Sequence, residues 1–95
     1  MAGGGVVIEK WCKSKRFHKE YDKLDNEMRD IVDSKLQDLA KPEMPLGLGF
    51  EKLKGHDNIY TIHVTGNYKV SFEIHEGNRA FLRRVGSHNE IDRLP

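Results

Sequence analysis

The hydrophobic positions in the N-terminal part of the chain recur mainly with the spacing of a helix. Val6 to Trp11 is rich in β-branched residues and predicts an initial strand. Two apolar stripes at helical spacing follow, and Ser14 and Asp25, both favourable helix N-caps, stand at their beginnings. Pro42 stops the second stripe. The pattern predicts a strand and then two helices that are joined by a short turn and pack as an antiparallel hairpin.

The stretch from Lys41 to Asp57 has no regular hydrophobic period. It holds two prolines and three glycines among scattered apolar residues. Glycine and proline at this density interrupt helices and strands. We expect a long loop that packs its apolar side chains onto the domain, and loops of this length are often functional.

From Asn58 to His88 the polar and apolar residues alternate, which is the period of a strand with one buried face. The turn-forming pairs Gly66-Asn67 and Gly77-Asn78 divide this stretch into three runs. The pattern predicts a three-stranded antiparallel meander. We expect a last helical turn from Asn89 to Leu94.

The register of the first hairpin follows from its two faces. A three-residue loop, Thr65-Gly66-Asn67, places Ile62 opposite Val70 and His63 opposite Lys69, so that apolar residues face apolar residues. A two-residue loop would place His63 opposite Val70 and mix the faces. Because a slip of one residue reverses every side chain, the pattern selects the first register.

The second hairpin is predicted to turn through a two-residue loop at Gly77-Asn78. This loop pairs Ile74 with Phe81, apolar on apolar. It also leaves Arg83 on the apolar face beside Phe72. We expect Arg83 at the sheet edge, with its aliphatic stem packed and its guanidinium in water.

The predicted order of strand, helix, helix, loop and three strands is that of an α+β fold with two layers. The helical hairpin covers one face of the sheet, and the other face is expected to be open and polar. Ninety-five residues fit one domain, 1–95, in which residues 1–5 form a flexible leader.

Composition narrows the functional classes. Hydrophobic residues make up 37% and charged residues 33%, which suits a small folded domain rather than a disordered chain. The net charge of +1 is lower than that of most dedicated nucleic-acid binders. The single cysteine, Cys12, cannot form an internal disulfide and is expected to be a half-buried small residue. No apolar run approaches the ~20 residues that span a bilayer, so we expect a cytoplasmic protein with no membrane partner.

The polar face of the meander carries the candidate chemistry. The register places His63, Lys69 and Arg84 on this face, and His88 follows a glycine at the end of the last strand. Histidine can act as base or acid near neutral pH, and a fixed cation can stabilise a phosphorane, so the face suits cleavage of a phosphodiester. In RNA the nucleophile can be the neighbouring 2′-hydroxyl. No compact metal-ligand spacing occurs, and we predict neither a metal nor a small-molecule cofactor.

Strand alternation alone favours a simpler explanation. His63 and Lys69 could form an exposed cross-strand pair on a solvated sheet face, which antiparallel sheets commonly have. Lys52 and Lys54 could likewise be ordinary surface charges, although they precede Gly55 and could approach a phosphate backbone.

Three segments together resemble a known family. They are Leu53-Lys54-Gly55, residues 59–74, and Leu82-Arg83-Arg84-Val85-Gly86-Ser87-His88, which follow the helical hairpin. The pattern is similar to the RelE/ParE superfamily of type II toxins over roughly Val7 to Leu94. The resemblance implies a RelE-like fold and a cognate antitoxin as partner. For RelE-like members it also implies metal-independent cleavage of mRNA on the ribosome.

The resemblance also implies roles for particular residues. His63 and His88 match histidines of the YafQ-like branch, and Lys69 stands where members usually carry an arginine that contacts the reacting phosphate. We therefore predict His63, Lys69 and His88 as catalytic, with one histidine as the base and the other as the acid. Asn67 replaces an aspartate of that branch, and Leu94 stands where RelE has a catalytic tyrosine. A YafQ-like histidine mechanism fits the chain better than a RelE-like one.

A further group of residues is predicted to contact RNA: Lys52, Lys54, Asn67, Arg83 and Arg84. Two other functions remain open at this point. A ParE-like inhibitor of DNA gyrase would share the fold but would not need the two histidines. An inactive member of the fold would act through protein contacts alone.

Overall fold

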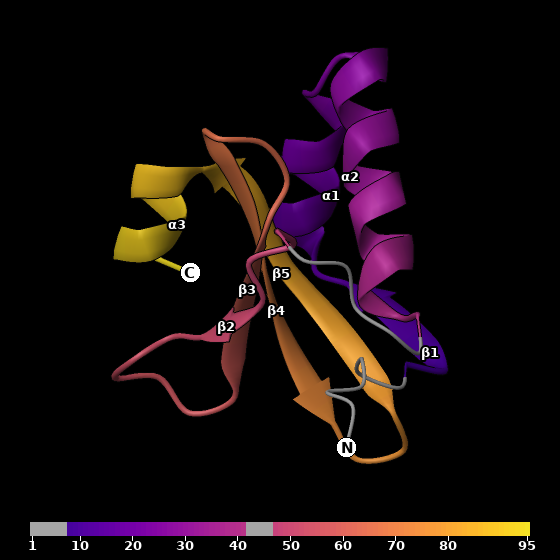
Figure 1. The fold of residues 1–95 in the computed structure, drawn as a ribbon, viewed down its shortest axis with the longest axis vertical. Coiled ribbons are helices and arrows are strands. Elements are labelled where there is room, and N and C mark those ends of the chain that lie inside the picture. Colours follow the sequence, from indigo (N-terminus) through magenta and orange to yellow (C-terminus); the bar gives the residue numbers. More distant parts are fainter. Residues whose placement is uncertain (1–7, 42–46) are drawn as a thin grey trace.

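The computed structural model describes residues 8–41 and 47–95. The elements within these residues are β1 (Lys10–Lys13), α1 (Lys15–Asp22), α2 (Asn26–Leu39), β2 (Glu51–Lys52), β3 (Ile59–His63), β4 (Tyr68–His75), β5 (Arg79–Ser87) and α3 (His88–Arg93). The described strands form one five-stranded sheet in the order β1-β5-β4-β3-β2 (Figure 1). Among the described strands, only β1 and β5 are parallel neighbours. The predicted α+β class is confirmed, and the predicted leader, residues 1–5, lies outside the described residues.

Both helices of the hairpin begin where the sequence predicts. The Ser14 hydroxyl accepts a hydrogen bond from the N–H of Phe17 at 2.9 Å, and the Asp25 carboxylate accepts one from the N–H of Met28 at 2.8 Å. These caps satisfy N–H groups that have no partner inside the helix. The predicted stop at Pro42 lies outside the described residues.

The first strand is displaced from the predicted Val6 to Trp11, of which residues 6 and 7 lie outside the described part. β1 begins at Lys10, opposite Arg79 of β5, and all four of its residues are exposed. Its position is therefore set by its partner strand rather than by an apolar run. The expectation that Cys12 is half-buried is wrong, because it is exposed on this edge strand.

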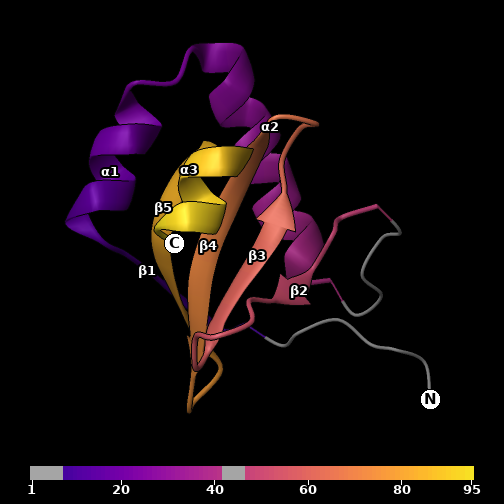
Figure 2. The ribbon, with the colours of Figure 1, turned by 90° about the vertical axis from the view of Figure 1, so that its left-hand side faces the viewer.

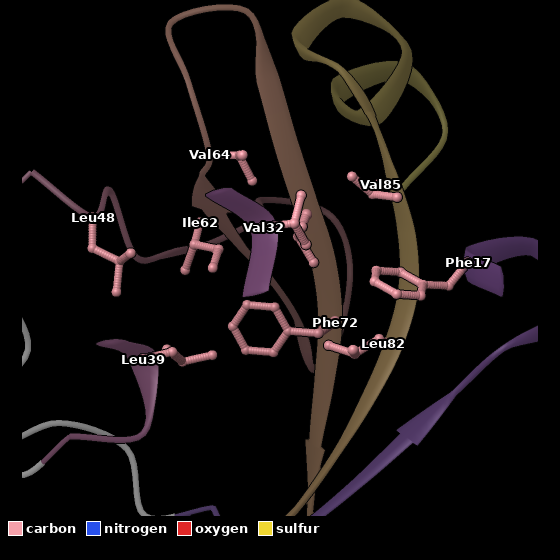
Figure 3. Packing of buried hydrophobic residues seen from close by; sticks show 10 residues of the cluster. Phe17, Val32, Leu39, Leu48, Ile62, Val64, Phe72, Leu82 and Val85 are labelled. Atoms are coloured by element: carbon pink, nitrogen blue, oxygen red, sulfur yellow. The ribbon is translucent and has the colours of Figure 1, made fainter. Parts of the chain in front are cut away.

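The hydrophobic core lies between the helical hairpin and one face of the sheet (Figures 1 and 3). Its buried side chains are Phe17, Val32, Leu39, Leu48, Ile62, Val64, Val70, Phe72, Leu82 and Val85. Each large apolar side chain removed from water contributes roughly 1.5–3 kcal/mol. Leu48, which is 2% exposed, confirms that the segment after α2 packs onto the domain.

A short strand interrupts the predicted loop from Lys41 to Asp57. β2 pairs antiparallel with β3, with Glu51 opposite Thr61 and Lys52 opposite Tyr60. Two residues are too few to show an alternating pattern, so the sequence carries no signal for this strand.

The predicted register of the first hairpin is confirmed. Ile62 lies opposite Val70 and His63 opposite Lys69. Val70 in turn lies opposite Val85 on β5. The apolar face of the meander is thus continuous across three strands.

β5 contains an irregularity that the pattern did not reveal. Ser71 lies opposite Arg84, but the next pair is Phe72 opposite Leu82, so Arg83 is an extra residue in a β-bulge. The bulge shifts the register between itself and the second turn by one residue.

This shift corrects two predictions. Ile74 lies opposite Ala80 and not opposite Phe81. Arg83 is not left on the apolar face, and its guanidinium is ion-paired with Glu73 instead of standing free in water. The bulge thus explains why Arg83 did not fit the apolar alternation of the strand: it is the extra residue, and its side chain pairs with Glu73.

The expectation of an open polar face is also wrong. α3 lies over β4 and β5 on the face opposite α2 (Figure 2), and its residue Ile91 is fully buried. Below it the sheet buries a set of polar side chains: Thr61, Lys69, Ser71 and Arg84. The hydroxyls of Thr61 and Ser71 have no hydrogen-bond partner among the described residues.

The hydroxyl of Tyr21 joins the two helices of the hairpin. It donates to Asp33 at 2.7 Å. Burial, together with the hydrogen bond to Asp33 and the negative charge of Asp33, raises the pKa of Tyr21 to about 12. The pKa in the unfolded chain is about 10. The protonated Tyr21 hydroxyl, favoured by burial and by its bond to Asp33, therefore stabilises the folded state fully below pH ~10, and this contribution is lost as the pH rises from about 10 through about 12.

We predict that Tyr21→Phe lowers the free energy of unfolding by about 1 kcal/mol at pH 7. The wild type should also lose more stability than Tyr21→Phe between pH ~10 and ~12, because only the wild type has this proton to release. Urea unfolding followed by circular dichroism measures both. Equal losses in the two proteins over that range would contradict the role of the bond.

Candidate active site at the histidine pair

Two histidines that are far apart in the sequence meet at one end of the sheet. His63 is the last residue of β3 and His88 the first of α3. Nε2 of His88 lies 3.4 Å from Nδ1 of His63, and the ring centroids are 5.0 Å apart with the planes tilted by 40°. The backbone N–H of His88 donates to the carbonyl of Asn67 at 2.7 Å. The structure thus brings together the two histidines that were predicted to be catalytic.

The place of His88 depends on the cap of α3. The hydroxyl of Ser87 accepts from the N–H of Glu90, and the Glu90 carboxylate accepts from the N–H of Ser87 at 3.3 Å, which is a capping box. Hydrogen bonds from the Ser87 side chain and then from its backbone lower the pKa of Glu90. The helix therefore starts immediately after the strand, and His88 is held in its first turn.

The segment before β2 packs against His63. The backbone N–H of His63 donates to the carbonyl of Leu48 at 2.7 Å. Gly49 has φ +70°, and a Cβ at this position would lie 1.9 Å from Cδ2 of the His63 ring. Only glycine allows this close approach, so the segment and the imidazole are packed together.

Lys69, the third predicted catalytic residue, is buried between two carboxylates. Its side chain is 4% exposed, and Nζ lies 2.8 Å from Oδ1 of Asp92 and 3.8 Å from Oε1 of Glu51. A buried ammonium needs such partners to offset its loss of hydration. Oδ2 of Asp92 also lies 3.7 Å from Nδ1 of His88. The predicted contact of Lys69 with a phosphate is not tested by this arrangement and remains a prediction.

Sequence reasoning missed Asp92 and Glu51. Asp92 stands four residues after His88, the spacing that places two side chains on one face of a helix, so the predicted last helical turn could have revealed the pair. For Glu51 no such signal existed, because β2 itself was not predicted.

A cavity of about 450 Å³ adjoins His63. Its lining residues are Lys35, Gly47, Gly49, His63, Val64, Thr65 and Gly66. Lys35 comes from α2 and was not predicted as a site residue. Among the ion pairs formed between described residues, none involves Lys35. Lys35 is the one lysine or arginine among the described residues that line the cavity beside His63.

The residues predicted to contact RNA divide into two groups. Lys52, Lys54 and Asn67 are exposed. Arg84 is buried, with Nη2 at 2.6 Å from Oε2 of Glu20, and this hydrogen bond raises the pKa of Arg84 further.

Both predicted arginines therefore have carboxylate partners within the protein. Nη1 of Arg84 also donates to the carbonyl of Leu94 at 2.9 Å, so Arg84 links α1, β5 and the end of α3. Arg83 is paired with Glu73. Their contact with RNA stays a prediction and would require competition with these carboxylates.

Two general features complete the description. Within residues 8–41 and 47–95, no group of three or more histidine, cysteine or carboxylate side chains is arranged to hold a metal ion. In the same part of the chain, no helix is both long and apolar enough to cross a membrane.

We predict that Gly49→Ala displaces the His63 ring, because the added methyl overlaps Cδ2. Gly55→Ala is the matched control: its φ is +81°, but a Cβ there would meet nothing within 4 Å. Both variants should lose about 1 kcal/mol from backbone strain. Only Gly49→Ala should shift the imidazole NMR signals of His63 and His88. Equal spectra for the two variants would contradict this packing.

Comparison with known proteins gives matches in structure only. Neither protein-family models nor curated protein sequences match the chain. A chain of the RelB–RelE antitoxin–toxin complex from Methanococcus jannaschii is 26% identical, with a TM-score of 0.65 over 88% of this chain and 99% of that chain. A YoeB/ParE toxin from Agrobacterium tumefaciens is 20% identical, with a TM-score of 0.70 over 84% and 99% of the two chains.

The fold of this chain is also found in a YafQ structure, and YafQ-like toxins are the branch whose histidines match His63 and His88 in the sequence. A chain of the DinJ–YafQ complex from Escherichia coli is 15% identical, with a TM-score of 0.66 over 87% of this chain and 97% of that chain. The likenesses span nearly the whole of each neighbour. The chain therefore has the fold of these RelE, YafQ and YoeB/ParE toxins.

Proposed function

We propose that the chain is the toxin of a type II toxin–antitoxin system and that it is a metal-independent endoribonuclease acting on mRNA at the ribosome. The observation that carries the proposal is the contact between His63 and His88, with 3.4 Å between Nε2 and Nδ1, beside a cavity that one of them lines. Two histidines in contact supply both a base and an acid near neutral pH.

The chemistry needs only groups that the protein and RNA possess. One histidine takes the proton of the 2′-hydroxyl, whose oxygen attacks the adjacent phosphorus. The bond from phosphorus to the 5′-oxygen breaks, and the other histidine gives that oxygen a proton. The products are a 2′,3′-cyclic phosphate and a free 5′-hydroxyl. Negative charge on the phosphorane would be stabilised by the Lys35 ammonium at the cavity wall.

A cognate antitoxin is the proposed protein partner. Two of the structural neighbours were crystallised as complexes of this kind, the RelB–RelE complex of Methanococcus jannaschii and the DinJ–YafQ complex of Escherichia coli. A ribonuclease that acts on cellular mRNA must be restrained in the cell that makes it, which supports the same expectation for this chain.

The test is induced expression followed by primer extension on cellular mRNA. We expect the wild type to stop growth and cut mRNA, and His63→Ala or His88→Ala to lower the cleavage rate about 100-fold or more. His75→Ala is the control, because this histidine is exposed and paired with Glu73, away from the pair. Growth arrest with intact mRNA and gyrase-linked DNA breaks would replace the ribonuclease proposal with a gyrase poison. Full cleavage by His88→Ala would refute the site.

We predict that Lys35→Met lowers the rate of mRNA cleavage at least about ten-fold, because it removes the charge beside His63. Lys19→Met is the control, since Lys19 is exposed on α1 and does not line the cavity. Purified variants acting on mRNA bound to ribosomes give the rates. Equal rates for the two variants would exclude Lys35 from the site.

A further inference from the structure

Asp92 joins the buried lysine to the histidine pair. One carboxylate oxygen lies 2.8 Å from Nζ of Lys69, and the other lies 3.7 Å from Nδ1 of His88. Lys69 is almost wholly buried, so its ammonium cannot replace this carboxylate with water. The ion pair therefore fixes the direction in which the second oxygen of Asp92 faces the imidazole.

The charge of Asp92 beside His88 favours one arrangement of protons on the two rings. Oδ2 of Asp92 is too far from Nδ1 of His88 for a direct hydrogen bond, but its negative charge at 3.7 Å favours the form of neutral His88 with its proton on Nδ1. With the proton on Nε2, the lone pair of Nδ1 would face the carboxylate, acceptor against acceptor. In the favoured form, with the proton of His88 on Nδ1, Nε2 of His88 is an acceptor. Nδ1 of His63, 3.4 Å away, then supplies the proton between the two rings. Nε2 of His63 is left without a proton.

We propose that Lys69 and Asp92 are a positioning pair that orders the protons of the two histidines and makes His63 the general base. The catalytic meaning of this assignment rests on the proposed function, whereas the proton positions rest on geometry alone. Lys69 then acts through Asp92 and His88 rather than on the phosphate. This explains why a lysine of the site is 4% exposed and bound by carboxylates.

The ordered pair forms a proton path. Nε2 of His63 takes the proton of the 2′-hydroxyl, and Nδ1 of His63 passes its own proton to Nε2 of His88. Nε2 of His88 then turns from Nδ1 of His63 toward the departing 5′-oxygen and delivers that proton to it. One proton leaves the 2′-oxygen and one reaches the 5′-oxygen, so the sequence balances. Asp92 faces His88 while His88 holds the additional positive charge, and Lys69 keeps Asp92 in place.

Long-range proton–nitrogen NMR of the ¹⁵N-labelled wild-type protein tests the proton positions directly. The spectra are recorded at mildly alkaline pH, because a neutral imidazole carries a single ring proton that identifies its tautomer. We expect both His63 and His88 to carry the proton on Nδ1, and an Nε2 proton on His88 would overturn the proposal. This measurement needs no variant and no RNA. It decides the proton order even if the chain does not cut mRNA, which would refute only the proposed function.

Variants then test the roles of the pair. Asp92→Asn should convert a large part of His88 to the Nε2-protonated form. It should lower kcat for mRNA cleavage on ribosomes about 10- to 100-fold, with KM changed less than about three-fold. Asp92→Glu, which keeps the carboxylate, should recover part of the loss. Glu51→Gln is the matched control, because Glu51 also lies near Lys69 but does not touch either histidine.

Lys69→Met separates the two roles of the lysine. If Lys69 positions Asp92, this variant lowers kcat and disturbs the His88 tautomer. If it instead raises KM and leaves the tautomers unchanged, Lys69 contacts the substrate phosphate and the positioning role is wrong. Thermal unfolding of each variant identifies losses that come from unfolding, and the NMR of the wild type remains decisive where a variant does not fold.

Discussion

The ion pair between Lys69 and Asp92 is the interaction on which the site depends. It anchors α3 to the centre of the sheet, together with the burial of Ile91. Loss of Asp92 would leave the buried ammonium of Lys69 with only the more distant carboxylate of Glu51 as a partner. The helix held in this way begins with His88, and its docking brings that residue to His63. The same pair thus contributes to the fold, to the covering of the polar face and to the histidine contact.

The distribution of the other charges follows from this closed arrangement. Arg84 is held by Glu20 and by the carbonyl of Leu94, and it links α1 to β5 and to the end of α3. Arg83 is neutralised by Glu73 beside its bulge. Arg83 and Arg84 of the last strand therefore stabilise the packing of elements around the sheet. Lys35 borders the cavity from α2, and Lys52 and Lys54 are exposed around β2.

Local patterns predicted the local structure well and the global arrangement less well. The helix caps at Ser14 and Asp25 and the register between His63 and Lys69 were predicted correctly, because each depends on residues near one another in the sequence. The register near the second turn was wrong, since a bulge adds one residue without altering composition. The strand β2 was missed because a pair of residues shows no period.

The sequence by itself determined the α+β class, the helical hairpin, and the faces of the first hairpin. These follow from hydrophobic period and capping chemistry, which act over a few residues. Only the tertiary structure decided that α3 covers the polar face, that Lys69 is buried, and that Asp92 connects it to His88. The physical reason is that a polar residue can be solvated in water or paired in the interior. A strand shows the same alternation whether its polar residue is solvated or buried and paired. Which of the two occurs depends on whether the fold brings a distant carboxylate near that residue.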